Sequence, residues 1–285
     1  MARHPLTGYA LHPIPKERQP VLDRLTSASR RFQVHALVEL DVTTAAERIR
    51  EVQPTVSWTG FVIATVARAV AEHPEVNARK AGNQLLFFDR VDVGATVERP
   101  VGAHVVLDIA EIEAADERSC AEITAELHQA KFGPAPAHRQ DGMTAALVRL
   151  PGPLRRTAIR LVATRPSIAA TFGPAVGVTS VGMFTHGWGW AIPVAPLTLI
   201  VTVGHVAERP AVHHGQIVAR AMLPLTLSFD HAVIDGAPAA RFTDTLRTLI
   251  ETATALDDVE GQHATDPGRW AAHEHPVTEA QRHEQ

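Results

Sequence analysis

A histidine followed four residues later by an aspartate and a glycine is the strongest chemical signature in this sequence. Residues 225–229 alternate between apolar and polar side chains, as a β-strand does, and lead to His231, Asp235 and Gly236. A strand end fixes an imidazole, a glycine permits a sharp turn into a helix, and a carboxylate can brace the loop. This arrangement suits a general base, although a histidine and an aspartate at this spacing also form purely structural pairs.

The residues around this motif make it more specific. Residues 222–231, continued by 234–242, resemble the active-site signature of the dihydrolipoamide acyltransferase catalytic domain. That domain is the core component of 2-oxoacid dehydrogenase complexes and is related in fold to chloramphenicol acetyltransferase. Three further matches follow in the family's order, at residues 73–78, 91–97 and 177–183. The resemblance covers roughly residues 20–130 and 172–255, and its combination of motifs is specific while each motif alone is weak.

The resemblance implies a mechanism and roles for individual residues. His231 would act as the general base that deprotonates an acceptor thiol, or the thiol of CoA in reverse, for attack on an acyl thioester. Thr179 falls at the position of the family's hydroxyl donor, which stabilises the oxyanion. The alternatives are an ordinary strand threonine, or a one-residue shift that puts Ser180 in this role. Asp235 would brace the loop, paired with an arginine of the N-terminal helix for which Arg24 is the candidate.

The resemblance also implies an assembly and a set of ligands. Relatives form trimers with each active site at a subunit boundary, so we expect a homotrimer, while the sequence says nothing about the contacts of a larger shell. CoA, as acyl-CoA, is expected as a substrate, and no tightly bound cofactor is expected. Residues 1–18 are too few for a lipoyl domain. We therefore expect any lipoyl group to come from another protein, such as a component of a dehydrogenase complex.

Departures from the family pattern keep two other functions open. Ala232 stands where the family usually has arginine, and residues 102–109 lack its usual proline and arginine. One alternative is therefore acyl transfer to a small alcohol or amine on the same fold. The other is a catalytically weak trimeric scaffold that binds its partner through the basic segment 142–165. The joint presence of His231 and Thr179 favours the enzyme over the scaffold.

Composition argues against several other classes of function. The chain has 31 acidic and 27 basic residues, a net charge of −4, which is too balanced for a nucleic-acid-binding protein. Its single cysteine, Cys120, rules out an intramolecular disulfide and a cysteine-based zinc site, and its apolar helical neighbours predict a buried, unreactive thiol. The histidines of the C-terminal tail are too scattered for a metal site, so none is predicted.

Compartment and surface features follow from the remaining segments. The N-terminus lacks the apolar core of a signal peptide, and the apolar residues 61–70 are too few to span a bilayer, so we expect a cytoplasmic protein.

Segment 142–165 is interpreted as a solvated basic helical hairpin, a docking site for an anion such as a CoA phosphate, or a membrane-surface contact. His186, Trp188 and Trp190 would line a substrate channel or pack a trimer, and His213 and His214 lie in an expected hairpin turn.

The order of the expected elements predicts an α/β two-layer sandwich, with a mixed sheet and flanking helices. Helices are expected at 19–30, 43–53, 57–72, 113–131 and 237–255, and strands at 32–42, 85–88, 91–97, 104–107, 176–181, 197–206, 217–222 and 223–229. An irregular arm at 1–18 would precede a catalytic domain at 19–256. That domain carries a basic helical insert at about 133–171, and a polar, disordered tail follows at 257–285.

Overall fold

A computed structural model describes the chain at residue 14 and over 18–29, 31–52, 55–101, 104–133, 154, 157, 165–184 and 187–258. The helices are α1 (Gln19–Ala28), α2 (Thr43–Glu51), α3 (Trp58–Glu72), η2 (Ala115–Glu117), α4 (Cys120–Phe132), α7 (Pro166–Ala169), η3 (Gly182–Phe184), α8 (Gly236–Thr252) and η4 (Thr254–Leu256). The strands are β1 (Gln33–Asp41), β2 (Ala78–Ala81), β3 (Gln84–Phe87), β4 (Val93–Val101), β5 (His104–Ile112), β6 (Val176–Ser180), β7 (Leu199–Val203), β8 (Ala207–His213) and β9 (Gln216–Asp230).

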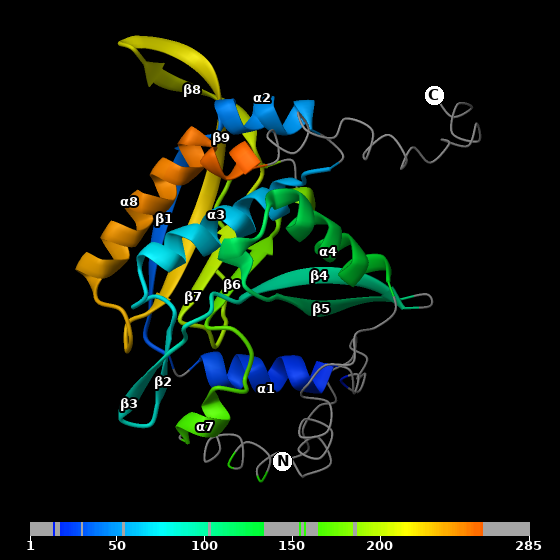
Figure 1. Cartoon of the computed structure of the whole chain (residues 1–285), viewed down its shortest axis with the longest axis vertical. Coiled ribbons are helices and arrows are strands. Elements are labelled where there is room, and N and C mark those ends of the chain that lie inside the picture. The colour runs from blue at the N-terminus through cyan, green and yellow to red at the C-terminus, as the bar shows by residue number, and fades with distance from the viewer. Residues whose placement is uncertain are drawn as a thin grey trace, which may run out of the picture.

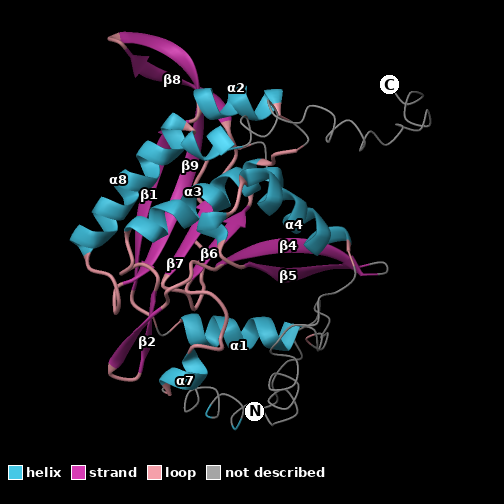
Figure 2. Cartoon of the chain, in the orientation of Figure 1, coloured by secondary structure: helices cyan, strands magenta, loops and turns pink. Residues whose placement is uncertain are grey.

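One seven-stranded mixed sheet organises these elements (Figure 1). Its order is β1-β9-β7-β6-β4-β5, and β8 pairs with the first part of β9. The β4–β6 and β6–β7 pairs are parallel and the other pairs are antiparallel. Helices α3, α4 and α8 lie together over one face of the sheet (Figure 2). The predicted sandwich of a mixed sheet and flanking helices is therefore confirmed.

The two faces of the sheet differ in chemistry because side chains alternate along each strand. On β9, Leu225, Leu227 and Phe229 belong to the core under the helices. Thr226 and Ser228 between them point to the opposite face, which none of these helices covers. Strand β1 alternates in the same way, since its residues opposite the three core positions of β9 are also packed against the core.

Helix α3 is the centre of the helical layer. Nearly its whole length is buried, from Gly60 to Val70, because α4 lies on one side of it and α8 on the other. Its start at Ser57 is as predicted, since the Ser57 hydroxyl accepts a hydrogen bond from the Gly60 N–H at 3.1 Å. The buried apolar side chains of α3 pack against the core face of the central strands.

The structure differs from the expected elements at several places. Strand β2, which pairs with β3, was not expected. The expected helix 113–131 begins only at Cys120, because Ser119 and Glu122 form a reciprocal capping box and β5 continues to Ile112. The two strands expected at 217–222 and 223–229 are one long strand, β9. Strand β8 was not expected. It pairs with β9 through the predicted hairpin turn, in which His214 and Gly215 have φ values of 50° and 78°.

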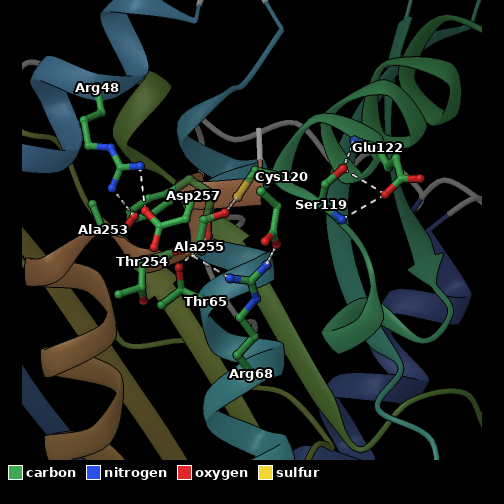
Figure 3. A network of polar contacts seen from close by, with 12 residues as sticks. Arg48, Thr65, Arg68, Ser119, Cys120, Glu122, Ala253, Thr254, Ala255 and Asp257 are labelled. Atoms are coloured by element: carbon green, nitrogen blue, oxygen red, sulfur yellow. Dashed lines mark hydrogen bonds and ion pairs between the residues drawn. The ribbon is translucent and has the colours of Figure 1, made fainter. Parts of the chain in front are cut away.

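Two arginines hold the residues that follow α8 (Figure 3). Arg48 of α2 donates to the Ala253 carbonyl at 2.9 Å and to Asp257 at 2.8 Å. Arg68 of α3 donates to Asp258 at 2.5 Å. These contacts fasten η4 and the residues just after it to the helical layer.

Several predicted segments lie outside the described residues. These are most of the N-terminal arm, most of the basic insert with its interpreted membrane or phosphate contact, the tail beyond 258, and His186. Their limits and roles stay predictions. Within the described ranges, no helix is both long and apolar enough to cross a membrane.

Candidate functional site

His231 lies directly after β9, where the chain leaves the sheet. Its backbone N–H donates a 2.6 Å hydrogen bond to the Phe32 carbonyl, just before β1, and its side chain is 43% exposed. The N–H groups of Val233 and Ile234 donate to the Asp230 carbonyl at 2.9 and 3.0 Å and close a tight turn. The main chain of His231 is therefore fixed while its imidazole is open to a substrate.

Asp235 is close to this imidazole without forming a hydrogen bond to it. Its Oδ1 lies 3.6 Å from Nδ1 of His231, which is beyond hydrogen-bond distance. The Asp235 side chain is 88% exposed, and although it is the N-cap residue of α8 it makes no capping bond. Because the Asp235 carboxylate is largely exposed, water screens its contact with His231.

Gly236 follows Asp235 at the start of α8. An added Cβ there would meet no atom within 4 Å, so close packing does not require the glycine.

A second carboxylate, that of Asp230, is buried and bonded on both oxygens, unlike that of Asp235. Its side chain is only 3% exposed and forms an ion pair with Nη1 of Arg31, which lies between α1 and β1. Its other oxygen accepts the Ala232 N–H at 3.1 Å. The carboxylate next to the histidine thus has a cation on one side and the main chain of the loop on the other.

Sequence reasoning missed Arg31 because its partner is 199 residues away in the chain. A signal was available, since Asp230 is an acid at the end of a buried strand and such acids are paired with a cation. The arginine that was expected, Arg24, lies in α1, but its side chain is outside the described residues. Its pairing with Asp235 stays a prediction.

Thr179 lies near the end of β6, on the sheet face away from the helices. It is directly opposite Thr202 of β7, which is opposite Thr226 of β9, so three threonines form a row across three strands. The hydroxyls of Thr202 and Thr226 are buried and have no hydrogen-bond partner among the described residues. Ser180 points to the other face, opposite the core residue Val203. Of the two candidate oxyanion donors, Thr179 and Ser180, the register therefore places only Thr179 in the row of threonine hydroxyls.

Thr179 and His231 are far apart within one chain. Thr226 of β9, in the row with Thr179, precedes His231 by five residues in the chain, and β9 and β6 are two strand spacings apart. Strand dimensions put the two residues roughly 19 Å apart. A single substrate carbonyl cannot contact both of them in one chain. A site that uses both residues must combine two chains.

Arg79 of β2 anchors the segment that leads into β6. Its guanidinium donates to the carbonyls of Ala169, Gly173 and Pro174 at 2.7, 2.8 and 2.6 Å. Burial, together with the nearby charge of Arg31, lowers the pKa of Arg79 to about 10, so it remains a cation at neutral pH. This buried cation fixes the position from which Thr179 is presented.

The connection from β6 to β7 crosses the helix-free face of the sheet. Trp190 donates from Nε1 to the Val38 carbonyl of β1 at 3.1 Å, and Gln33 donates from its side chain to the Ala195 carbonyl at 3.0 Å. The guanidinium of Arg209 lies 4.4 Å from the ring centre of Trp188. Trp188 and Trp190 therefore hold this crossover in place; their role in a channel or a trimer stays a prediction.

Cys120 lies in the helical layer, next to Ala255 (Figure 3). Its buried thiol lies 3.1 Å from the Ala255 carbonyl, to which it donates. Burial raises the pKa of the Cys120 thiol to about 12, so the thiol stays protonated and unreactive near neutral pH. The predicted buried cysteine is confirmed. In the described part of the chain, no three histidine, cysteine or acidic side chains come together as a metal site would require.

Comparisons with protein families and with known proteins both match this chain to acyltransferases of 2-oxoacid dehydrogenase complexes. The family described as 2-oxoacid dehydrogenases acyltransferase (catalytic domain) matches residues 13–132 and 154–256. The succinyltransferase component of the mitochondrial 2-oxoglutarate dehydrogenase complex of Saccharomyces cerevisiae is 25% identical over 238 residues, which cover 83% of this chain and 44% of that protein. The chain thus spans less than half the length of that curated relative.

Two solved structures share the fold. A probable dihydrolipoamide acetyltransferase from Listeria monocytogenes aligns with a TM-score of 0.64 and 22% identity, over 86% of this chain and 96% of that one. The cubic core of a pyruvate dehydrogenase multienzyme complex aligns with a TM-score of 0.63 and 22% identity, over 88% and 96% of the two chains. At this level of identity the similarity establishes the fold alone.

Proposed function

Because this chain belongs to the family of 2-oxoacid dehydrogenase acyltransferase catalytic domains, we propose that it transfers an acyl group between CoA and a thiol acceptor similar to dihydrolipoamide. The observation that carries the proposal is the fixed main chain and open imidazole of His231 at the end of β9. A thiol must lose its proton to become a nucleophile, and a positioned imidazole is the side chain best suited to take it near neutral pH.

The chemical steps follow from the two nitrogens of the His231 ring. Nδ1 faces Asp235, so Nε2 is the atom that accepts the proton of the attacking thiol. The sulfur attacks the thioester carbonyl and forms a tetrahedral oxyanion, to which the Thr179 hydroxyl of a neighbouring chain donates a hydrogen bond. When the intermediate collapses, the C–S bond to the leaving group breaks. The imidazolium returns its proton to the departing thiolate.

The same proposal requires an assembly in which chains meet at the active site. The separation of Thr179 from His231 demands two chains, and a closed ring of three identical chains supplies such a boundary at each contact. Exposed apolar residues on the helix-free face, Leu37 and Ile109, and at the projecting β8–β9 hairpin, Val212 and Ile217, offer surfaces for these contacts. The trimer is the unit from which any larger shell, like the cubic core of the structural relative, would be built.

The ligands and compartment follow from the same chemistry. CoA is a substrate here, no tightly bound cofactor is needed, and a lipoyl group would be carried by a partner component of a dehydrogenase complex. A reducing compartment such as the cytoplasm keeps these thiol substrates and Cys120 in the reduced state. Ala232 is exposed beside the histidine, at a position where the family usually has arginine, so small alcohols or amines are the second class of acceptor to test.

Acyl transfer from a panel of acyl-CoAs to dihydrolipoamide, measured by release of the CoA thiol, tests the proposal. The His231→Ala variant should lose about 10²–10⁴-fold in kcat. His128→Ala, which removes an exposed histidine of α4, is the matched control and should be unchanged. Turnover only with alcohols or amines would establish the second acceptor class. Absence of turnover with every donor and acceptor would favour the scaffold and contradict the proposal.

A further inference from the structure

The carboxylate of Asp230 links Arg31 to the loop that carries His231. One carboxylate oxygen pairs with the guanidinium of Arg31, and the other accepts the N–H of Ala232 at 3.1 Å. The Asp230 side chain is 3% exposed and that of Arg31 is 20% exposed, so water competes little for this pair. Arg31 therefore acts, through one carboxylate, on the residue directly after the histidine.

The main chain at His231 and at the residue before it is held from two segments of the chain. The N–H of His231 donates to the carbonyl of Phe32, the neighbour of Arg31, and the N–H of Asp230 donates to the Thr198 carbonyl at 2.9 Å. If Arg31 is removed, the Asp230 carboxylate becomes a buried charge without its cation. It must then rotate toward water or bind a proton, and either change weakens its hold on Ala232.

No other carboxylate in the described part of the loop can replace this support. Asp235 is 88% exposed and lies 3.6 Å from the imidazole, outside hydrogen-bond distance. The buried guanidinium of Arg79, which is near Arg31, donates to three carbonyls. The nearby charge of Arg31 contributes to the lowered pKa of Arg79, so these two cations repel each other. Asp230 compensates this repulsion and keeps Arg31 in place.

We propose that Arg31 is a positioning residue for His231 and acts through Asp230, in the reaction proposed above. The pair fixes where the imidazole meets the attacking thiol, while neither residue contacts the substrate. Misplacing a catalytic group by about 1 Å can cost about 100-fold in rate. We therefore expect loss of the pair to reduce kcat by about 10- to 100-fold, with KM changed by less than about threefold.

Four variants test this proposal in the full chain. Arg31→Ala removes the cation. Arg31→Lys keeps the positive charge but lacks the planar guanidinium that can donate two hydrogen bonds to a carboxylate, so its kcat should lie between those of Arg31→Ala and the wild-type protein. Asp230→Asn keeps an acceptor for Ala232 and removes the charge. The double variant Arg31→Met/Asp230→Asn leaves no unpaired buried charge, so it should fold even if Arg31→Ala does not. Added guanidinium ion should raise the kcat of Arg31→Ala and leave the wild-type protein unchanged.

Arg48→Ala is the matched control. Arg48 is 19% exposed, forms an ion pair with Asp257, and lies in α2, which adjoins β9 at the end away from His231. A folded double variant with wild-type kcat would overturn the proposal, and so would an equal fall of kcat in Arg48→Ala. Failure of the proposed function looks different, because the wild-type protein would then be inactive or His231→Ala would retain its activity. Either result would remove this proposal as well.

Discussion

Thr202 of β7 lies directly opposite Thr226 of β9, and both hydroxyls are buried without a hydrogen-bond partner among the described residues. A buried hydroxyl that makes no hydrogen bond costs about 1–3 kcal/mol in desolvation. The row they form continues to Thr179, the proposed oxyanion donor. The sheet therefore carries a local cost to stability next to a residue of the proposed site.

Replacing Thr226 by valine removes one of these hydroxyls and nearly keeps the side-chain shape. We expect Thr226→Val to raise the free energy of unfolding by about 1 kcal/mol, because the cost of the unpartnered group disappears. Thr65→Val is the matched control. Thr65 is also fully buried, but its hydroxyl donates to the Phe61 carbonyl at 2.8 Å, so its loss should be destabilising. Urea unfolding of both variants measures the difference, and destabilisation by Thr226→Val would indicate a bound water or an unseen partner.

The parts of the site that are local in sequence could be predicted. The alternation of residues 225–229, followed by a histidine, an aspartate and a glycine, placed His231 at a strand end and started a helix after Asp235. Thr179 came from the resemblance, and only the register of β6 with β7 separates it from Ser180, because adjacent residues of a strand point to opposite faces.

The parts that depend on distant pairing could not be predicted in the same way. Arg31 meets Asp230 across 199 residues, and no periodicity in either segment reports that contact. Strand β8 was missed because it is exposed and carries Pro210 and charged residues, so no core face reveals it. The start of α4 could have been predicted, because the capping box that fixes it is formed by two residues close in sequence, Ser119 and Glu122.

Mixing two inactive variants tests whether the site is shared between chains. His231→Ala removes the proposed base and Thr179→Ala removes the proposed oxyanion donor, so a homotrimer of either variant should lose activity. In a trimer randomly assembled from both, each boundary has about a one-in-four chance of joining an intact histidine to an intact threonine. Co-expression of the two chains should therefore restore about a quarter of the wild-type kcat. No recovery in co-assembled trimers would mean that the two residues do not act in one site.

Arg79 should contribute strongly to stability because its buried guanidinium serves three carbonyls. Arg79→Met leaves these carbonyls without their charged donor, and we expect the free energy of unfolding to fall by about 2–4 kcal/mol. Arg90→Met is the comparison, since Arg90 also makes two good hydrogen bonds, to Asp92, but is half exposed. Its loss should cost less than about 1 kcal/mol. Equal losses in calorimetry or urea unfolding would contradict the role assigned to burial.

The buried thiol of Cys120 should make stability fall at alkaline pH. Burial raises its pKa from 9.0 to about 12, so the folded state holds the proton more tightly than the unfolded state does. This contribution is complete below about pH 9 and is lost as pH rises toward about 12, by about 1.4 kcal/mol per pH unit. Urea unfolding between pH 8 and pH 10.5, compared with Cys120→Ala, measures it. The wild-type free energy of unfolding should fall more steeply than that of the variant, and parallel curves would show that the thiol ionises equally in both states.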